Sequence, residues 1–434
     1  MRIKLSDRQY LLINIIEAPL LAVIVGYFTK YSEGSEYIFA QNKNLISYIF
    51  MAIVVVLFMG MSVSAEEIIK DRKILQRESF LNLSRFSYIN SKVAFLVLLS
   101  AFQTLTFALV GNLVVGIHGM NMVYWMVLFS VSVFSNMLGL NISSAFNSVV
   151  TIYILIPLLL IPQILLCGVI VKFDDLQDKT ADKDAVPMVG EFMVARWAFE
   201  ALAVEQFAGN RYMADFFEEE KELAQVRYLS DLLLTELLGR TEYVAGQINA
   251  GKPAGDFAAK LAIIRNEIKE LDQNQVLPPL EVVDSIAPGK FSGRVSELAK
   301  QHLHKLQDFY LSRKNTLRKQ QDGKIFKLNQ QNGKNYLFDL KQQYNNLAIE
   351  NLVLNAGSNE YFRETKTGLM QKVAPVYKEP DFNNGRAHFL ASEKLIFSIP
   401  VDTLIFNIMI IWLMSLFLYA ALYWDWLRKI VNKS

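Results

Sequence analysis

The sequence contains one cysteine, Cys167, and four histidines in 434 residues. A single cysteine forms no disulfide within the chain, so any water-soluble part must fold on its own hydrophobic core. His302 and His304 are two positions apart and would face different sides of a helix, and the chain has neither an H-E-x-x-H motif nor a Cys/His cluster. We therefore expect neither redox chemistry nor a metal site.

Charge is also scarce. Lys, Arg, Asp and Glu make up 20% of the residues, the formal net charge is +2, and the polar region has no basic run interleaved with aromatic residues. This composition argues against nucleic acid as a partner. The phosphate-binding pattern G-x-x-x-x-G-K-[ST] is missing as well, and no nucleophile with a base can be named, so we do not expect this chain to be an enzyme by itself.

Apolar residues are abundant, at 52% of the chain with a mean hydropathy of +0.23, which is typical of a membrane protein. The charge is segregated, because residues 174–396 hold 29 of the 44 Lys and Arg and 32 of the 42 Asp and Glu. The chain therefore consists of an apolar body and a polar insert.

Spanning about 30 Å of hydrocarbon takes roughly 20 apolar residues in a helix. Six runs fit: 10–28, 45–64, 93–115, 122–140, 149–171 and 403–423. We predict an all-α membrane protein, a six-helix transmembrane bundle with a large, mostly helical extracytoplasmic domain before the last span. The predicted parts are 1–172 with five helices, 173–400 with the insert, and 401–434 with the last helix and a short tail.

Basic residues in the segment 64–92 and at both ends of the chain place these regions in the cytoplasm and the insert outside. A large external domain without disulfides points to a bacterial inner membrane. Within the insert, helical periodicity covers 213–250, 254–271 and 295–318, while an Asn-Gly pair between short mixed runs predicts a small hairpin over 325–340.

The cytoplasmic segment 64–92 is dense in charge but keeps regularly placed apolar residues. Such a segment can form an amphipathic helix with one face toward the membrane helices and one toward a partner. A solvated loop that obeys the positive-inside rule explains the composition equally well.

Three segments together resemble the membrane domain of G-subfamily ATP-binding-cassette exporters. The run DRKILQRE at 71–78, followed by Tyr88 and Lys92, is similar to the family's coupling helix. Residues 137–144 with 156–163 resemble its fourth-to-fifth span region, and RWAFEAL at 196–202 resembles its external helix. The similarity covers 10–210 and 400–430, whereas about 190 residues of the insert have no counterpart.

The resemblance implies a bacterial ABC transporter permease and assigns roles to particular residues. Those that would couple the spans to a nucleotide-binding domain are Arg72, Arg77, Glu78, Tyr88 and Lys92, and those of the external helix motif are Arg196, Trp197, Phe199 and Glu200. ATP and Mg would be held by the partner nucleotide-binding domain and no cofactor by this chain. A second copy of the chain, membrane lipid and, through the insert, periplasmic proteins complete the expected partners.

Polar residues inside the predicted spans are further candidates, because a buried polar group in a bilayer is costly. Glu17, Gln103 and Asn136 are the three that we single out. Glu17 could instead pair with Arg8 or cap a kink at Pro19, and Gln103 and Asn136 could simply join helices.

Three functions are consistent with these features. The first is the permease of an ATP-driven exporter that works as a homodimer. The second is a mechanotransmitter, in which ATP-driven movement of the spans acts on envelope partners through the external domain. The third is a membrane receptor or scaffold without transport.

Overall fold

The computed structural model describes residues 8–32, 36–77, 84–176 and 184–431. Its apolar helices are α2 (Arg8–Thr29), α3 (Leu45–Ala65), α5 (Arg85–Val115), α6 (Asn121–Ala145), α7 (Val149–Leu165) and α17 (Thr403–Tyr423). All of these except α7 are long and apolar enough to cross a membrane. The protein is therefore an all-α membrane protein, with five candidate spans among the residues described.

The fifth predicted span, 149–171, is shorter than expected. Helix α7 has 17 residues and ends at Leu165, which gives it a length of about 25 Å at 1.5 Å per residue. Pro157 and Pro162 lie inside it, and the chain turns away at Gly168, whose φ is +87°. A Cβ atom at Gly168 would lie 2.6 Å from the Phe173 ring, so only glycine fits this turn.

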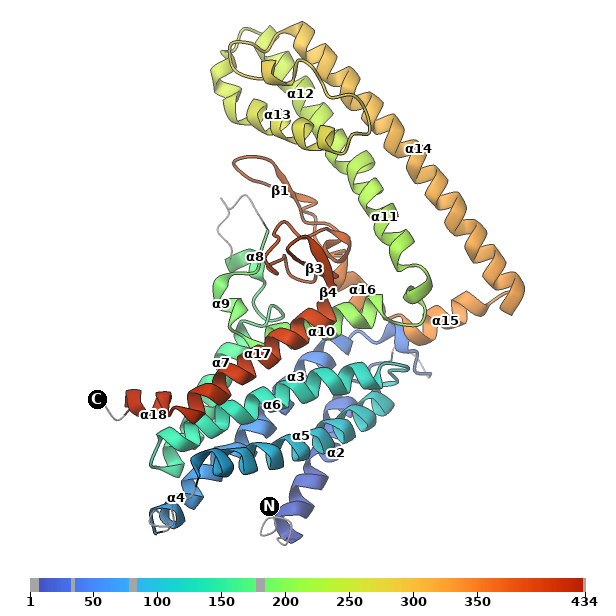
Figure 1. The fold of residues 1–434 in the computed structure, drawn as a ribbon. Helices are drawn as coiled ribbons and strands as arrows, with labels where there is room; N and C mark the ends of the chain where they lie inside the picture. Colours follow the sequence, from blue (N-terminus) through green and yellow to red (C-terminus); the bar gives the residue numbers. More distant parts are fainter. Residues whose placement is uncertain (1–7, 33–35, 78–83, 177–183, 432–434) are drawn as a thin grey trace.

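Shorter elements surround the apolar helices. They are η1 (Phe39–Gln41), α4 (Glu67–Arg77), α8 (Phe173–Leu176), α9 (Met188–Glu191), α10 (Val194–Ala208) and α18 (Trp426–Val431). Figure 1 shows α4, the N-terminus and α18 at the end of the helix bundle that is turned away from the polar region. This arrangement leaves α4 free to meet a partner on that side.

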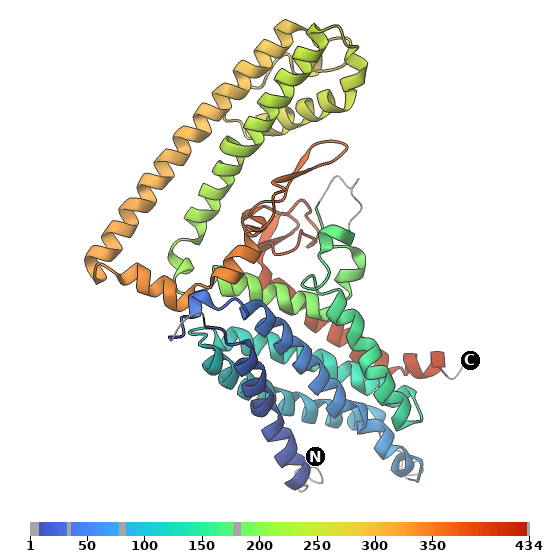
Figure 2. The same ribbon diagram turned by 180° about the vertical axis from the view of Figure 1, so that it is seen from behind.

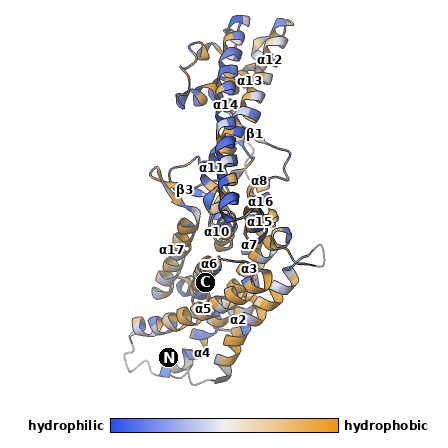
Figure 3. Ribbon diagram, turned by 90° about the vertical axis from the view of Figure 1, so that its right-hand side faces the viewer, coloured by the Kyte–Doolittle hydropathy of each residue, from blue (hydrophilic) through white to orange (hydrophobic). Residues whose placement is uncertain are grey.

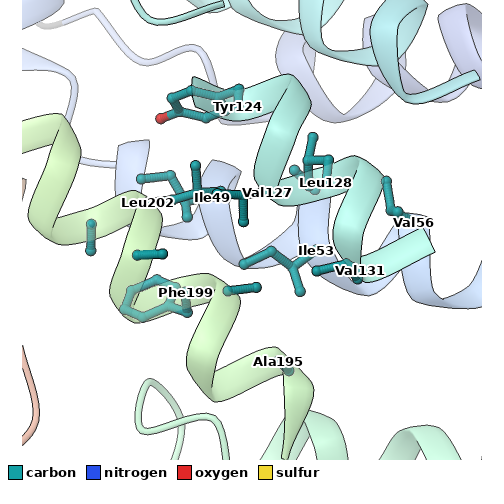
Figure 4. Packing of buried hydrophobic residues seen from close by; sticks show 14 of the residues in the cluster. Ile49, Ile53, Val56, Tyr124, Val127, Leu128, Val131, Ala195, Phe199 and Leu202 are labelled. Carbon is teal, nitrogen blue, oxygen red and sulfur yellow. The ribbon is translucent and has the colours of Figure 1, made fainter. Parts of the chain in front are cut away.

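Helix α6 lies at the centre of the bundle and is packed by α3, α5, α10 and α17. Figure 4 shows how the side chains of three of these helices interlock: Ile49, Ile53 and Val56 from α3, Tyr124, Val127, Leu128 and Val131 from α6, and Ala195, Phe199 and Leu202 from α10. The external helix motif thus lies in the core of the bundle.

Glycines allow α3 and α6 to approach closely. A Cβ atom at Gly60 of α3 would lie 2.8 Å from Ser135 Cβ and 3.1 Å from the carbonyl oxygen of Ser132, both on α6. Gly139 of α6 faces the carbonyl oxygen of Met61 in the same way, at 3.1 Å. The hydrophobic effect does not drive helices together inside a membrane. Small residues at a crossing let the two backbones approach closely, so that dispersion contacts and hydrogen bonds hold the helices together.

The polar region forms a long helical hairpin followed by short strands. Its helices are η3 (Met213–Asp215), α11 (Phe217–Arg227), the π-helical η4 (Tyr228–Leu233), α12 (Leu234–Asn249), η5 (Ala254–Phe257), α13 (Ala258–Gln273), η6 (Val283–Ser285), α14 (Gly293–Asn332), α15 (Tyr336–Tyr344), α16 (Leu347–Val353) and η7 (Pro375–Tyr377). Strand β1 (Phe362–Glu364) pairs antiparallel with β2 (Leu369–Gln371), and β3 (Glu393–Ile396) with β4 (Ile399–Asp402).

We call residues 217–332 the arm. Helices α11 and α12 run alongside α14 and project away from the bundle, with α13 at the far end (Figures 1 and 2). Figure 3 shows that hydrophobic residues dominate the bundle while the arm is largely hydrophilic. The arm has its own buried core, including Leu237, Leu261, Ile264 and Leu303, as a chain without disulfides requires.

The predicted hairpin over 325–340 is wrong. Helix α14 continues through Gly323 to Asn332, and α15 follows at Tyr336. The Asn-Gly pair ends the helix, because Gly333 has a φ of +113°, as is common one residue beyond a helix. Ion pairs to α11, such as Lys324 to Glu219 at 2.8 Å, hold this last part of α14 in place.

Replacing Gly60 by Ala tests the close contact between α3 and α6. The added methyl group must push the helices apart, and we expect a loss of about 1–3 kcal/mol in the free energy of unfolding, as for other overpacked cores. The thermal unfolding midpoint in one detergent measures it. Gly239→Ala in α12 is the matched control: its Cβ meets nothing within 4 Å, so helix propensity should make it neutral or stabilising. Equal midpoints would contradict the packing argument.

Candidate functional site

Helix α4 begins directly after α3 and is attached to α6 by its backbone. The N–H groups of Ile68 and Ile69 both donate to Ser143 Oγ, at 3.0 and 3.1 Å. The first N–H groups of a helix have no partner within the helix, so this hydroxyl serves as a cap from a neighbouring span. The start of α4 is therefore fixed relative to α6.

A charged network fixes the same helix to α5. Lys92 Nζ lies 3.1 Å from Glu67 Oε2 and 2.6 Å from Asp71 Oδ2, and the Tyr88 hydroxyl donates to Asp71 Oδ2 at 3.1 Å. Glu67 and Asp71 are four apart on α4, and Tyr88 and Lys92 are four apart on α5, so each pair lies on one helix face. Tyr88 and Lys92, two of the predicted coupling residues, hold α4 on the spans.

Arg72 extends this attachment to the connection between α6 and α7. Its Nη2 donates to the carbonyl oxygen of Ser144 at 2.8 Å, and its Nη1 donates to Asn147 Oδ1. Ser144 is in the last turn of α6, where the carbonyl groups lack partners within the helix. A basic side chain that donates to them stabilises this end of α6. Arg72 is thus a third predicted coupling residue that acts within the protein.

Arg77, at the end of α4, is exposed. Glu78 lies outside the described residues. Of the five predicted coupling residues, the structure therefore brings Tyr88 and Lys92 into one network, places Arg72 on the connection after α6, and leaves Arg77 facing solvent.

The same end of the bundle contains contacts that the sequence analysis missed. Arg85 forms an ion pair with Asp425 and donates to the carbonyl oxygen of Leu422 at 3.2 Å, while the Tyr419 hydroxyl donates to Asn90 Oδ1 at 2.9 Å. These contacts attach the end of α17 to the start of α5. The spacing of residues along the chain gives no signal for these contacts, because their partners lie more than 300 residues apart.

The predicted external helix motif forms a buried charged cluster at the other end of α17. Arg196, Glu200 and Lys394 are each completely buried. Glu200 Oε1 accepts from Lys394 Nζ at 2.8 Å and from the Leu390 N–H at 3.0 Å, and Oε2 accepts from Asn407 Nδ2 at 3.0 Å. A buried carboxylate is tolerated only when donors satisfy it in this way.

The remaining motif residues surround this carboxylate. Arg196 Nη2 lies 3.6 Å from Glu200 Oε2, and its guanidinium stacks over the Trp197 ring at 3.8 Å. The Trp197 carbonyl oxygen accepts from Asn407 Nδ2 at 2.9 Å, and the Phe199 ring stacks on Phe389 with centroids 6.3 Å apart. The motif therefore joins α10 to α17 and to the segment around β3.

A second charged cluster lies beside the first, in the strand region. Burial would raise the pKa of Asp184, but the ammonium groups of Lys378 and Lys372 outweigh it and keep that pKa below its usual value. Burial lowers the pKa of His388 to about 4, so it is neutral at pH 7 and its Nε2 donates to the Pro375 carbonyl oxygen at 2.7 Å. Both groups stabilise the connection between the strands and the bundle.

The predicted intramembrane candidates differ in their surroundings. Gln103 Nε2 donates to the backbone oxygen of Asn14 at 2.9 Å, joining α5 to α2, and Asn136 Nδ2 donates to Ser100 Oγ at 2.6 Å, joining α6 to α5. These contacts fit the alternative that both join helices. Glu17 is partly exposed on α2. Within the described ranges, no three His, Cys, Asp or Glu residues are placed to hold a metal ion.

Removing the Glu200 carboxylate tests the buried cluster. Glu200→Ala leaves Lys394 and Arg196 buried without their partner, and we expect the free energy of unfolding to fall by about 3–5 kcal/mol. The thermal unfolding midpoint measures this loss. The control is Glu297→Ala, which removes an exposed ion pair with Lys300 and should leave the midpoint unchanged. A Glu200→Ala protein as stable as the parent would show that the cluster contributes nothing.

Comparisons with known proteins agree with this architecture. No curated protein matches the chain. The sequence profile of the family described as ABC-2 type transporter matches residues 1–207, a range that includes α4, α10 and the apolar helices before the arm. Such a permease is the transmembrane component of an ABC transporter, pairs with an ABC ATP-binding component and is not itself the ATPase. Residues 1–207 therefore belong to the ABC-2 type transporter family, and the chain is a multi-pass membrane permease component of an ABC transporter.

Proposed function

We propose that this chain is the permease of an ATP-driven exporter of the G-subfamily type, working as a homodimer in a bacterial inner membrane with both termini in the cytoplasm. ATP and Mg would be bound by the partner nucleotide-binding domains. The observation that carries the proposal is the attachment of α4 to α5, to α6 and to the connection before α7.

This attachment is what a coupling helix requires. A helix joined to several spans by short polar contacts moves with them as one body, because packed helices shift between discrete arrangements and do not deform continuously. A displacement imposed on α4 from the cytoplasmic side would therefore tilt α5 and α6. In this proposal Arg77 and Glu78 contact the nucleotide-binding domain, while Arg72, Tyr88 and Lys92 transmit the movement.

The dimer is supported by the exposed surface of α7. Val150, Ile154, Leu158 and Ile161 are more than half exposed along this helix. An apolar face of this kind must be covered by lipid or by another apolar surface. A second copy related by a two-fold axis would cover it and, in the resembled family, encloses the substrate path.

Mechanotransmission is a second candidate, and the arm favours it. Helix α14 has 40 residues, about 60 Å at 1.5 Å per residue. The base of the arm is attached to the strand region, because Lys221 Nζ on α11 lies 2.9 Å from Glu393 Oε1 on β3. Movement of the spans could reach periplasmic partners along this route. Stimulation of ATP hydrolysis by cargo in liposomes without envelope partners would favour export over mechanotransmission.

A reversal of charge at the end of α4 tests the proposed coupling. For the double variant Arg77→Glu with Glu78→Lys, we expect the chain to fold normally but recovery of its ATP-binding subunit from co-expressing membranes to fall about tenfold or more, which corresponds to 1.4 kcal/mol or more of lost binding. The measurement is the ATPase activity that co-purifies with the chain.

The control is Glu218→Lys with Arg294→Glu, two exposed positions on the arm. It should retain the full co-purified ATPase activity. Undiminished activity in the Arg77 and Glu78 variant would contradict this docking site. Absence of any ATPase from the parent preparation would instead support a receptor or scaffold.

A further inference from the structure

A cleft of about 770 Å³ separates the arm from the β1–β2 hairpin. One wall comes from η4 and α13, and the other from β2 and the segment 378–381. The cleft lies far along the chain from the ABC-2 type domain and does not involve α4 or the Glu200 cluster. Transport as proposed above gives it no role.

The charge of the cleft is predominantly negative. Glu267 and Glu270 line it from α13, and Glu379 and Asp381 line it from the opposite segment. Lys378 is the one basic side chain in this lining, and it is already bound to Asp381 at 3.1 Å and close to Asp184. A cation in the cleft would therefore meet an uncompensated negative potential.

Two polar side chains in the wall have unused hydrogen-bonding capacity. Glu267 is 6% exposed, and its Oε1 accepts from the Leu369 N–H at 2.5 Å, but its Oε2 has no hydrogen-bond partner among the described residues. Tyr228 is 7% exposed, and its hydroxyl has no partner in the described part of the chain either. Neither atom is among the fully buried polar atoms without a partner, so both open onto the cleft, where a ligand can reach them.

The rest of the wall is apolar. Leu229 and Leu233 of η4, Leu271 of α13, and Leu369 and Met370 of β2 line the same space. A π-helical turn inside a longer helix frequently marks a functional site, and here η4 contributes both Tyr228 and the two leucines. The cleft thus combines a few polar groups with an apolar surface, as small-molecule sites do.

We propose that the cleft between the arm and the β1–β2 hairpin binds a small cationic amphiphile. Its ammonium group bonds to Glu267 Oε2 and to the Tyr228 hydroxyl oxygen, and its apolar part packs on Leu271 and Met370. Because the two walls belong to the arm and to the hairpin, the bound molecule braces one against the other.

The protonation of Glu267 gives this site a pH dependence. The pKa of Glu267 is raised to about 7, mainly by burial. The hydrogen bond from the Leu369 N–H lowers this pKa, the charge of Glu270 raises it, and the charge of Arg240 on α12 lowers it. Lys378, Glu379 and Asp381 face it from the other wall. Glu267 is mostly neutral at pH 6 and mostly ionised at pH 8, so the affinity for a cation should rise over this interval.

The experiment uses the full chain in lipid nanodiscs and dansylcadaverine, a fluorescent primary amine, followed by fluorescence anisotropy. We expect its affinity to rise roughly five- to tenfold from pH 6 to pH 8, since about a tenth of Glu267 is ionised at the lower pH and about nine tenths at the higher. Glu267→Gln, which keeps the size and the acceptor for the Leu369 N–H, should bind at least tenfold more weakly at pH 8 with a flat pH profile.

Two controls separate this site from adsorption of the probe to lipid or protein. Glu242→Gln changes an exposed carboxylate on α12 outside the cleft and should bind like the parent. N-acetylated dansylcadaverine has no charge and should bind at least tenfold more weakly than the amine. Equal affinity for the acetylated probe, or a parent affinity that does not change from pH 6 to pH 8, overturns the proposal even if Glu267→Gln fails to fold.

Discussion

The position of the last membrane helix depends on one buried carboxylate. Glu200 accepts from Lys394, which is 194 residues away in the chain, from the Leu390 N–H and from Asn407 on α17. Because a buried carboxylate and a buried ammonium are costly without partners, these segments are held together here. The chain between Glu200 and Lys394 therefore forms a loop whose two ends are held together at the bundle. The arm can be long without disturbing the bundle, since the entropic cost of a closed loop rises only slowly with its length.

The opposite end of the bundle uses the same chemistry for a different purpose. Lys92 between Glu67 and Asp71 holds α4 on α5, and Arg85 with Asp425 holds the end of α17 on the same helix. Between these ends, small residues and hydroxyl groups let the spans approach closely. Charge pairs at both ends and close packing in between join the helices of the bundle to one another, as force transmission from α4 to the strand region would require.

The sequence predicted the membrane class and the apolar helices because long apolar runs depend on length and composition alone. It also found the Arg196 to Glu200 motif and the segment of α4. It could not show that Arg72, Tyr88 and Lys92 face inward, because an amphipathic helix has two faces and the partner of each depends on tertiary packing. The hairpin over 325–340 failed for a related reason: an Asn-Gly pair ends a helix as readily as it forms a turn, and contacts between α14 and α11 decide the outcome.

Strand β3 is the junction between bundle and arm. Consecutive residues of a strand point to opposite faces, so Lys394 reaches the buried Glu200 while its neighbour Glu393 reaches Lys221 at the start of the arm. Movement of α10 or α17 would thus reach α11 through β3, beside the direct packing of Phe207 of α10 on Phe217 of α11. The cleft lies farther along the arm, where β2 meets α13 through the Leu369 N–H and Glu267. A molecule bound there would contact the arm and the hairpin but not the Glu200 cluster.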